Sequence, residues 1–567
     1  MSNQLSMLVP PNNNHNGAST RSTTRTHHEA KLIISPESRH DNAVTVQHEN
    51  DDTPQTHWWK RYITWSVLVF CLVAMLAIGI SLGSSNTTKN NENTPSLRPI
   101  LPSDQPSESS TPSRSDLPWS HRPSSSSPPS TTHYDLSSLP WCRWGQVTTI
   151  GGEADANDWM GWSTALSSDG TIVAVGAPGS PFDVEDRPGY VKVYYRRDID
   201  NNNGSRSWEQ LGSNYMEGAD DGDLFGQSLA LSSDGKVLAV GAPGYFDRRD
   251  RPGYARVYSL EDGGDGSPST WTQIGRDIRG EDDGDMSGIS VALSADGGTL
   301  AVGANANGES RGRVRVYRVD GEGTDSRWKR LGRDIEGEAV SDNSGKSVDL
   351  SADGNIVAVG APINNGENGE RSGHVRVYRL SMEEGGGEPR WKRLGRDIDG
   401  EAAGDWSGRS VSLAADGTTL AIGANGNDGN GESSGHVVVY RLMEGEHGDD
   451  SSWERIGEDI EGEAADDQFG VHVALSADGT TLVIGANGND GNGVSSGHVR
   501  VYYMENTDTG FIWKRLGRVI DGEAPGDNSG FSVAISANGK AVAIGSPWHS
   551  GTNGDASGHV RVFDIEH

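Results

Sequence analysis

The chain has 567 residues, of which 33% are hydrophobic and 76 are glycine. Its formal net charge of −32 at pH 7 argues against nucleic-acid binding and against flat docking on anionic lipid, because phosphate groups repel such a surface. Residues 1–62 are electrically balanced, and residues 63–140 hold four basic and five acidic residues, so the excess acid lies in the remainder. That surface favours cations or basic partners and promotes solubility.

The first part of the chain predicts a tail followed by a membrane span. Residues 1–62 are rich in Asn, Thr, Ser and His and are expected to be disordered. Ile63 to Leu82 is a 20-residue stretch without a charge, which predicts a transmembrane signal anchor over residues 63–83. Two basic residues directly precede it and the next is Lys89, so the positive-inside rule places the N-terminus in the cytosol. We therefore expect a single-pass, type II membrane protein whose C-terminal part is extracellular or lumenal.

A stalk is predicted after the span. Residues 84–140 are dominated by Ser, Pro and Thr, a composition typical of an extended, O-glycosylated segment. Asn86 and Asn203 lie in sequons on the lumenal side, which makes this a predicted glycoprotein. The chain has only two cysteines. Cys71 lies in the predicted span, so Cys142 is either a buried thiol or a link between chains.

A segment close to Ala-Val-Gly-Ala-Pro recurs seven times, which predicts one structural unit repeated many times. Each copy holds a short alternating run, an Asp-Gly type turn, an apolar run, a second alternating run and a tryptophan run. Four strands per copy without helical periodicity predict an all-β fold, a seven-bladed β-propeller of four-stranded blades over residues 141–567. The glycines of the seven copies are Gly176, Gly241, Gly303, Gly360, Gly423, Gly485 and Gly545.

The two ends of the array complement each other. The last copy stops before its tryptophan run, whereas an extra tryptophan run precedes the first copy. We therefore expect Trp144–Ile150 to complete the seventh blade and close the ring, which removes two exposed strand edges. The seven outer strands would then carry Trp144, Trp208, Trp271, Trp328, Trp391, Trp453 and Trp513.

Two glycine motifs carry a resemblance to a known family. A Phe-Gly or Ser-Gly pair opens the unit, as at Phe225 and Gly226, and Gly-Ala-Pro closes its second strand, as at residues 176–178. The pattern resembles the FG-GAP repeat of integrin-alpha-type propellers. The resemblance implies the propeller fold and suggests adhesion or recognition. That family carries calcium in some first hairpins, but the hairpins of this chain, such as residues 351–354, are too short for those ligands.

Acidic residues recur in the connection from each tryptophan run to the next blade. In blades three to seven a Glu is followed four residues later by an Asp, and blades one and two keep Asp158 and Asp223. One interpretation is that the Asp accepts backbone N–H groups in the turn. The other is bound calcium, since oxygen ligands on flexible loops suit this ion. The pairs are Glu281 and Asp285, Glu338 and Asp342, Glu401 and Asp405, Glu463 and Asp467, and Glu523 and Asp527.

Four histidines share one strand position in blades four to seven. They are His374, His436, His498 and His559. Because they lie one blade apart, they cannot converge on one metal ion, and we interpret them as packing or surface residues.

Blades one and two break the pattern of the Gly- and Asn-rich loops. Their loops combine aromatic side chains with arginine, the residue types that dominate interaction hot spots. This predicts a ligand patch on two neighbouring loops; the alternative is a variant loop without a role in binding. The candidate binding residues are Phe182, Arg187, Tyr190, Tyr245, Phe246, Arg248, Arg249 and Arg251.

The sequence favours binding over catalysis. It contains neither a Gly-x-Ser-x-Gly elbow nor a His-Glu-x-x-His motif nor a P-loop, and its carboxylates recur in most blades instead of marking one site. We therefore expect a non-enzymatic recognition protein, adhesion-like, that binds a protein at its propeller loops. The alternatives are a lectin-like module that binds a glycan and, third, a glycan-active hydrolase. Calcium is the one cofactor that these patterns suggest.

Overall fold

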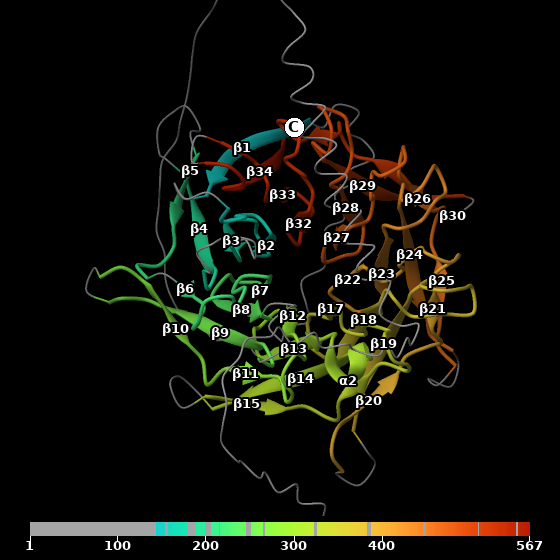
Figure 1. Ribbon diagram of the computed structural model, residues 1–567, viewed down its shortest axis with the longest axis horizontal. Helices are drawn as coiled ribbons and strands as arrows, with labels where there is room; N and C mark the ends of the chain where they lie inside the picture. Colours follow the sequence, from blue (N-terminus) through green and yellow to red (C-terminus); the bar gives the residue numbers. More distant parts are fainter. Residues whose placement is uncertain are drawn as a thin grey trace, which may run out of the picture. The chain divides into compact units, whose positions relative to one another are not determined.

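In a computed structural model the described residues are 143–152, 157–179, 187–198, 206–214, 216–244, 251–264, 267–321, 326–382, 387–445, 450–508, 510–551 and 554–566. Within these ranges the chain forms seven antiparallel sheets around one axis, the predicted seven-bladed propeller (Figure 1). The predicted tail, span and stalk lie outside the described residues. Among the described residues, no helix has the length and apolar character needed to cross a membrane.

Each blade is a meander whose strands run from the axis outward. The innermost strands are β2 (Ser163–Leu166), β7 (Ser228–Leu231), β12 (Ser287–Leu293), β17 (Ser347–Leu350), β22 (Ser410–Leu413), β27 (His472–Leu475) and β32 (Ser532–Ile535). The second strands are β3 (Ile172–Ala177), β8 (Val237–Ala242), β13 (Thr299–Ala304), β18 (Ile356–Ala361), β23 (Thr419–Ala424), β28 (Thr481–Ala486) and β33 (Ala541–Ser546).

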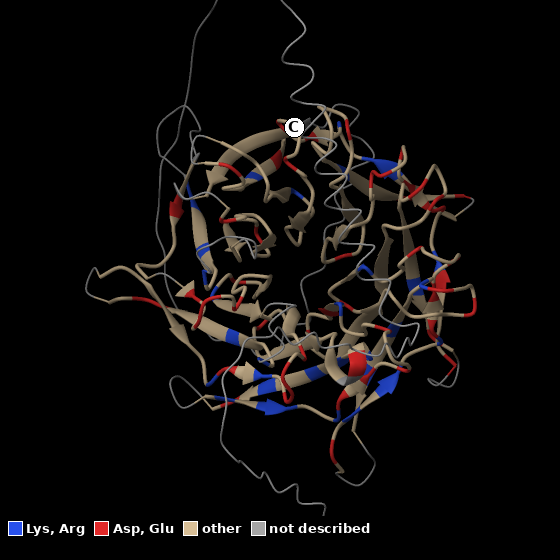
Figure 2. Cartoon of the chain, viewed as in Figure 1, with Lys and Arg blue, Asp and Glu red and all other residues tan. Residues whose placement is uncertain are grey.

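The outer half of each blade is more polar. The third strands are β4 (Tyr190–Asp198), β9 (Tyr254–Glu261), β14 (Arg313–Asp320), β19 (His374–Ser381), β24 (His436–Met443), β29 (His498–Thr507) and β34 (His559–Glu566). The tryptophan strands are β5 (Arg206–Gln210), β10 (Thr270–Gln273), β15 (Arg327–Arg330), β20 (Arg390–Arg393), β25 (Ser452–Arg455), β30 (Gly510–Arg515) and β1 (Arg143–Gly151). Figure 2 shows the basic residues of β15 and β20 on this outer side.

Six blades contain a feature that the sequence pattern did not predict. After the outer strand the chain loops out and then continues in the same direction along the third strand, where it adds a two-residue strand to that strand's free end. The outer strand is short, so it leaves that end of the third strand without a partner. The added strands are β6 (Met216–Glu217), β11 (Ile278–Arg279), β16 (Ile335–Glu336), β21 (Ile398–Asp399), β26 (Ile460–Glu461) and β31 (Ile520–Asp521). One four-residue helix, α2 (Asn307–Ser310), interrupts the strands in blade three.

The ring closes as predicted. The N-terminal strand β1 pairs antiparallel with the C-terminal strand β34, from Arg143 opposite Glu566 to Gly151 opposite His559. A shift in register between Gln146 and Thr148 lets this single strand cover both the outer-strand and the added-strand positions. In Figure 1 the first and the last coloured segments of the chain accordingly meet in one blade.

The core consists of apolar layers between neighbouring blades. Between blades four and five, for example, Val375 and Val377 pack with Leu420 and Ile422. The repeat glycines allow this close approach: a Cβ atom on Gly241 would lie 2.0 Å from a backbone oxygen of the next blade. The outer-strand tryptophans add polar links, since six of the seven donate an indole N–H to a carbonyl of the preceding blade.

Seven backbone hydrogen bonds form a closed circle around the axis. In each first hairpin the residue between Ser and Asp, or its equivalent, donates its N–H to the same residue of the next blade, over 2.8–3.0 Å. The last bond runs from Ala537 to Ser168 and closes the circle. Every hairpin tip therefore has the same height and orientation relative to the axis. The members are Ser168, Ser233, Ala295, Ala352, Ala415, Ala477 and Ala537.

Candidate functional site

The aspartates of the acidic connections are buried in all seven blades. Each is at most 4% exposed. In blade three, Asp285 accepts the backbone N–H groups of Glu281 and Asp282 through its Oδ2 atom, at 3.0 and 3.1 Å. The same pair of bonds recurs in blade two and in blades four to seven. The acceptors there are Asp223, Asp342, Asp405, Asp467 and Asp527.

The second oxygen of this aspartate receives a side chain from the following loop. Asn307 donates to Asp285 over 2.7 Å, and Asn489 donates to Asp467 over 2.9 Å. In blade seven His549 takes the place of this asparagine, with its Nδ1 atom 3.0 Å from Asp527.

In blades one and two, an arginine and a tyrosine contact the corresponding aspartate. Arg187 and Tyr190 both contact Asp158, over 2.8 and 3.0 Å. Arg251 contacts Asp223 over 2.8 Å, and the Tyr254 hydroxyl donates to the same carboxylate over 2.8 Å. Three of the predicted ligand residues therefore anchor the ends of their loops. The other five predicted ligand residues and the sequon residue Asn203 lie outside the described residues, as does Asn86.

The glutamates of the acidic pairs face arginines. Glu281 pairs with Arg313 and Arg315, which hold the pKa of this carboxyl at about 2, well below its usual range. Arginines of the third and outer strands likewise pair with Glu338, Glu401, Glu463 and Glu523. The five pairs stay in separate blades, and their carboxylates have protein partners.

These contacts are the ones that the turn interpretation requires. We therefore expect millimolar calcium to leave the melting temperature of the metal-free chain unchanged, because calcium would have to displace backbone and arginine partners. Thermal unfolding followed by circular dichroism measures this. A rise in melting temperature with calcium, absent with magnesium, would support the calcium interpretation instead.

The four repeated histidines are buried, each at most 3% exposed. Burial lowers the pKa of His374 to about 4 and that of His498 to about 3, so these rings are neutral at neutral pH. They do not converge on one another. Three of them, however, each stand next to acidic or histidine side chains of their own blade, in the groups Glu338, His374 and Asp397; Glu401, His436 and Asp459; and Glu523, His549 and His559.

Aromatic side chains gather where blade one meets blade seven. Trp159 and Trp162 stack with ring centroids 5.2 Å apart, and Trp162 lies 4.5 Å from Phe531 and 5.7 Å from Trp548. All four side chains are half-buried. The sequence patterns did not single out this cluster. The available signal was the variable position directly before the innermost strand, which carries Trp162 in blade one and Phe531 in blade seven where blade four has Lys346.

Cations occupy the same repeat position in two other blades. Lys346 and Arg409 follow the glycine of the Ser-Gly pair in blades four and five. Burial, and then the charge of Arg409, lowers the pKa of Lys346 to about 7, and burial lowers the pKa of Arg409. Within the described ranges no carboxylate pairs with either side chain. Nearby, burial and Arg409 lower the pKa of His472 to about 4, and its Nδ1 atom has no hydrogen-bond partner there.

Comparison with known proteins agrees with the geometry of the repeats. The sequence model of the FG-GAP repeat matches residues 398–440 and 461–502, in blades five and six. The chain carries FG-GAP repeats. The Phe-Gly and Gly-Ala-Pro glycines are the positions at which neighbouring blades approach each other most closely, as at Gly241.

Two solved structures match the chain over most of their own length. One is the periplasmic gluconolactonase PpgL of Pseudomonas aeruginosa, with 16% identity over 66% of this chain and 96% of that one, at a TM-score of 0.43. The other is Sqt1 from Chaetomium thermophilum, with 16% identity over 74% of this chain and 90% of that one, also at 0.43. Likeness at this level says nothing of function. No curated protein matches the chain.

Proposed function

We propose that this protein is a membrane-anchored, extracytoplasmic recognition protein that binds a protein partner through the loops of blades one and two. The observation that carries the proposal is the anchoring of these loops. Arg187 with Tyr190, and Arg251 with Tyr254, tie the C-terminal ends of the loops to buried carboxylates. Fixed loop ends shorten the segment that a partner would have to order on binding, which favours affinity.

The proposal is for binding and not for catalysis. The repeated carboxylates that could have formed a hydrolytic pair hold turns or face arginines, as Asp285 and Glu281 do. These partners engage the oxygen atoms that a general acid or base would need.

The test is charge reversal at the loop tip. Arg248→Glu with Arg249→Glu is expected to weaken binding of the full-length chain to partner-bearing cells at least tenfold, because hot-spot arginines dominate such interfaces. The melting temperature is expected to stay unchanged, since the anchoring residue Arg251 is kept. Arg371→Glu, on an exposed loop of blade four, is the matched control. Equal binding by all three proteins would refute the patch.

A second candidate, carbohydrate binding, is favoured by the cluster of Trp159, Trp162, Phe531 and Trp548. Aromatic faces on one side of the innermost ring and the cations Lys346 and Arg409 on the other suit a sugar that carries an acid group. Competition by glucuronate but not by glucose would favour this candidate. Turnover of a chromogenic glucuronide would instead favour the hydrolase alternative.

A further inference from the structure

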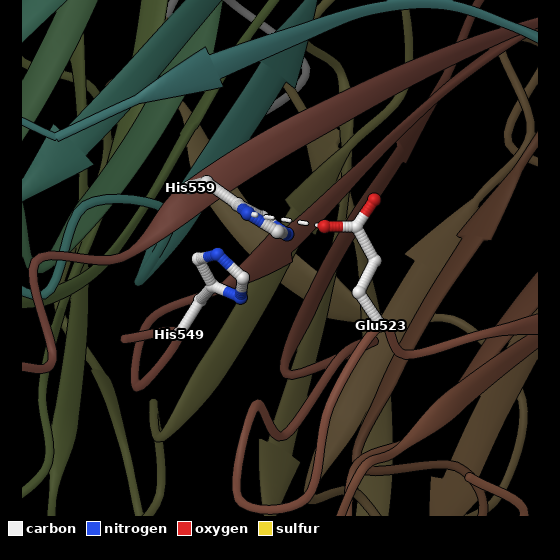
Figure 3. A group of neighbouring side chains, drawn as sticks. All are labelled: Glu523, His549 and His559. Carbon is white, nitrogen blue, oxygen red and sulfur yellow. Dashed lines mark ion pairs between the residues drawn. The ribbon is translucent and has the colours of Figure 1, made fainter. Parts of the chain in front are cut away.

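Blade seven contains a group of ligand-type side chains that differs from the groups of blades four and five in having two histidines and one carboxylate. Glu523, His549 and His559 each offer one ligand atom, and these atoms lie within 4.8 Å of one another (Figure 3). They come from three segments: the connection after β31, the loop after β33 and the first residue of β34. His559 is 2% exposed, whereas the Glu523 side chain is 42% exposed. The group therefore has one ligand in the core and another that solvent can reach.

The two similar groups in blades four and five already contain a cation. Arg376 pairs with both Glu338 and Asp397. Arg455 likewise pairs with both carboxylates of its group. A guanidinium between two carboxylates offsets one of their two charges and occupies the place that a metal ion would take.

Blade seven lacks the second carboxylate. Its outer strand is β1, which has Thr149 before Ile150, where blade four has Asp397 before Ile398. Arg561, which corresponds to Arg376 of blade four, has other partners. Its Nη2 atom donates to the Asp521 carbonyl over 2.8 Å and to the Ser529 hydroxyl over 2.9 Å. Its Nη1 atom lies 3.9 Å from Oε1 of Glu523, which leaves Oε2 facing His559.

The surroundings of His549 and His559 favour the binding of a metal ion. Asp527 holds the Nδ1 atom of His549 at 3.0 Å, and this hydrogen bond leaves Nε2 of His549 for a ligand. Carboxylate–histidine pairs of this kind orient metal-bound imidazoles in many zinc sites. The His559 ring is buried, its Nδ1 atom lies 3.9 Å from Oε2 of Glu523, and its Nε2 atom has no hydrogen-bond partner among the described residues. A buried polar atom in this state is costly, and a bound ion would remove that cost.

We propose that Glu523, His549 and His559 bind a divalent transition-metal ion, with zinc as the probe. Two imidazoles and one carboxylate are a known zinc donor set that leaves a fourth position for water. The ion would join the loop that carries His549 to β34 and to the preceding connection. Trp548 precedes His549 directly, so metal binding would also fix one side of the aromatic cluster.

The repeat itself supplies the variants for a test. His549→Asn restores the asparagine that blade six has as Asn489, so the metal-free fold is expected to melt as the parent does. The full-length chain, freed of metal with a chelator, is titrated with zinc against a chromophoric chelator. The parent is expected to bind one more zinc ion per chain than His549→Asn does, whatever other histidines of the chain contribute. His436→Asn, in an arginine-filled group, is expected to bind zinc as the parent does.

A gain of function completes the test. In blade six Asn489 lies beside Asp467 as His549 lies beside Asp527, and Glu463 and His498 take the positions of Glu523 and His559. Arg500 pairs with Glu463, so Asn489→His alone is expected to gain at most weak zinc binding, and Asn489→His with Arg500→Gln is expected to gain one ion. Equal zinc stoichiometry in the parent and in His549→Asn would overturn the proposal, even if the double variant fails to fold.

Discussion

Deleting residues 141–150 is expected to abolish the cooperative thermal transition and to yield insoluble or protease-sensitive protein. The deletion removes nearly all of β1, which pairs with β34 over eight residues. It would expose the edge of β34 and uncover the apolar residues Val560 and Val562, both now fully buried. Limited proteolysis and calorimetry of the purified chain measure the effect.

A matched deletion at the opposite end of the predicted stalk serves as the control. Removing residues 84–93 takes ten residues from the predicted stalk and keeps all of β1, so the transition is expected to persist. A β1 deletion that melts like the parent would disprove closure by this strand.

Replacing Asp223 by alanine is expected to destabilise the propeller by about 1–3 kcal/mol, the usual cost of leaving a buried hydrogen-bonding group without its partner. Asp223 accepts two backbone N–H groups, the Arg251 guanidinium and the Tyr254 hydroxyl, and it is 4% exposed. Alanine would leave the buried Tyr254 hydroxyl without this acceptor and would remove the shared partner of the two backbone N–H groups and Arg251. The urea concentration at the unfolding midpoint is the measurement.

The neighbouring Asp221 provides the control for this change. It is exposed, so Asp221→Ala is expected to shift the free energy of unfolding by no more than about 0.5 kcal/mol. Equal midpoints for the two variants would mean that the buried carboxylate does not hold the connection. A drop in partner binding by Asp223→Ala at a temperature where it remains folded would link the loop anchor to the proposed function.

The repeat made the fold predictable, because each blade obeys the same rules of strand period and turn chemistry. The closing strand followed from one missing and one extra tryptophan run. The added two-residue strands were missed, because a pair such as Ile398 and Asp399 is too short to show a period. The regular connections were understood in part, since Asp285 behaves as the turn interpretation expects.

The candidate sites were harder to predict because they depend on differences between blades. His559 was correctly expected to stay apart from the other three repeated histidines. Its partner His549 was overlooked, because it stands at a loop position that other blades fill with asparagine. Trp162 and Phe531 are 369 positions apart in the sequence, and only closure of the ring brings them together.

The pairing of β1 with β34 also determines how the propeller would respond to tension. The chain enters the propeller at Arg143, at the free end of β1, opposite Glu566 of the last strand. If the preceding segment is tethered to a membrane and the loops hold a partner, the pull reaches the ring through this strand. Where it runs along β1, the eight paired positions carry the load together in shear and do not open one after another. The strand that completes the fold would then also be the part that sets its mechanical strength.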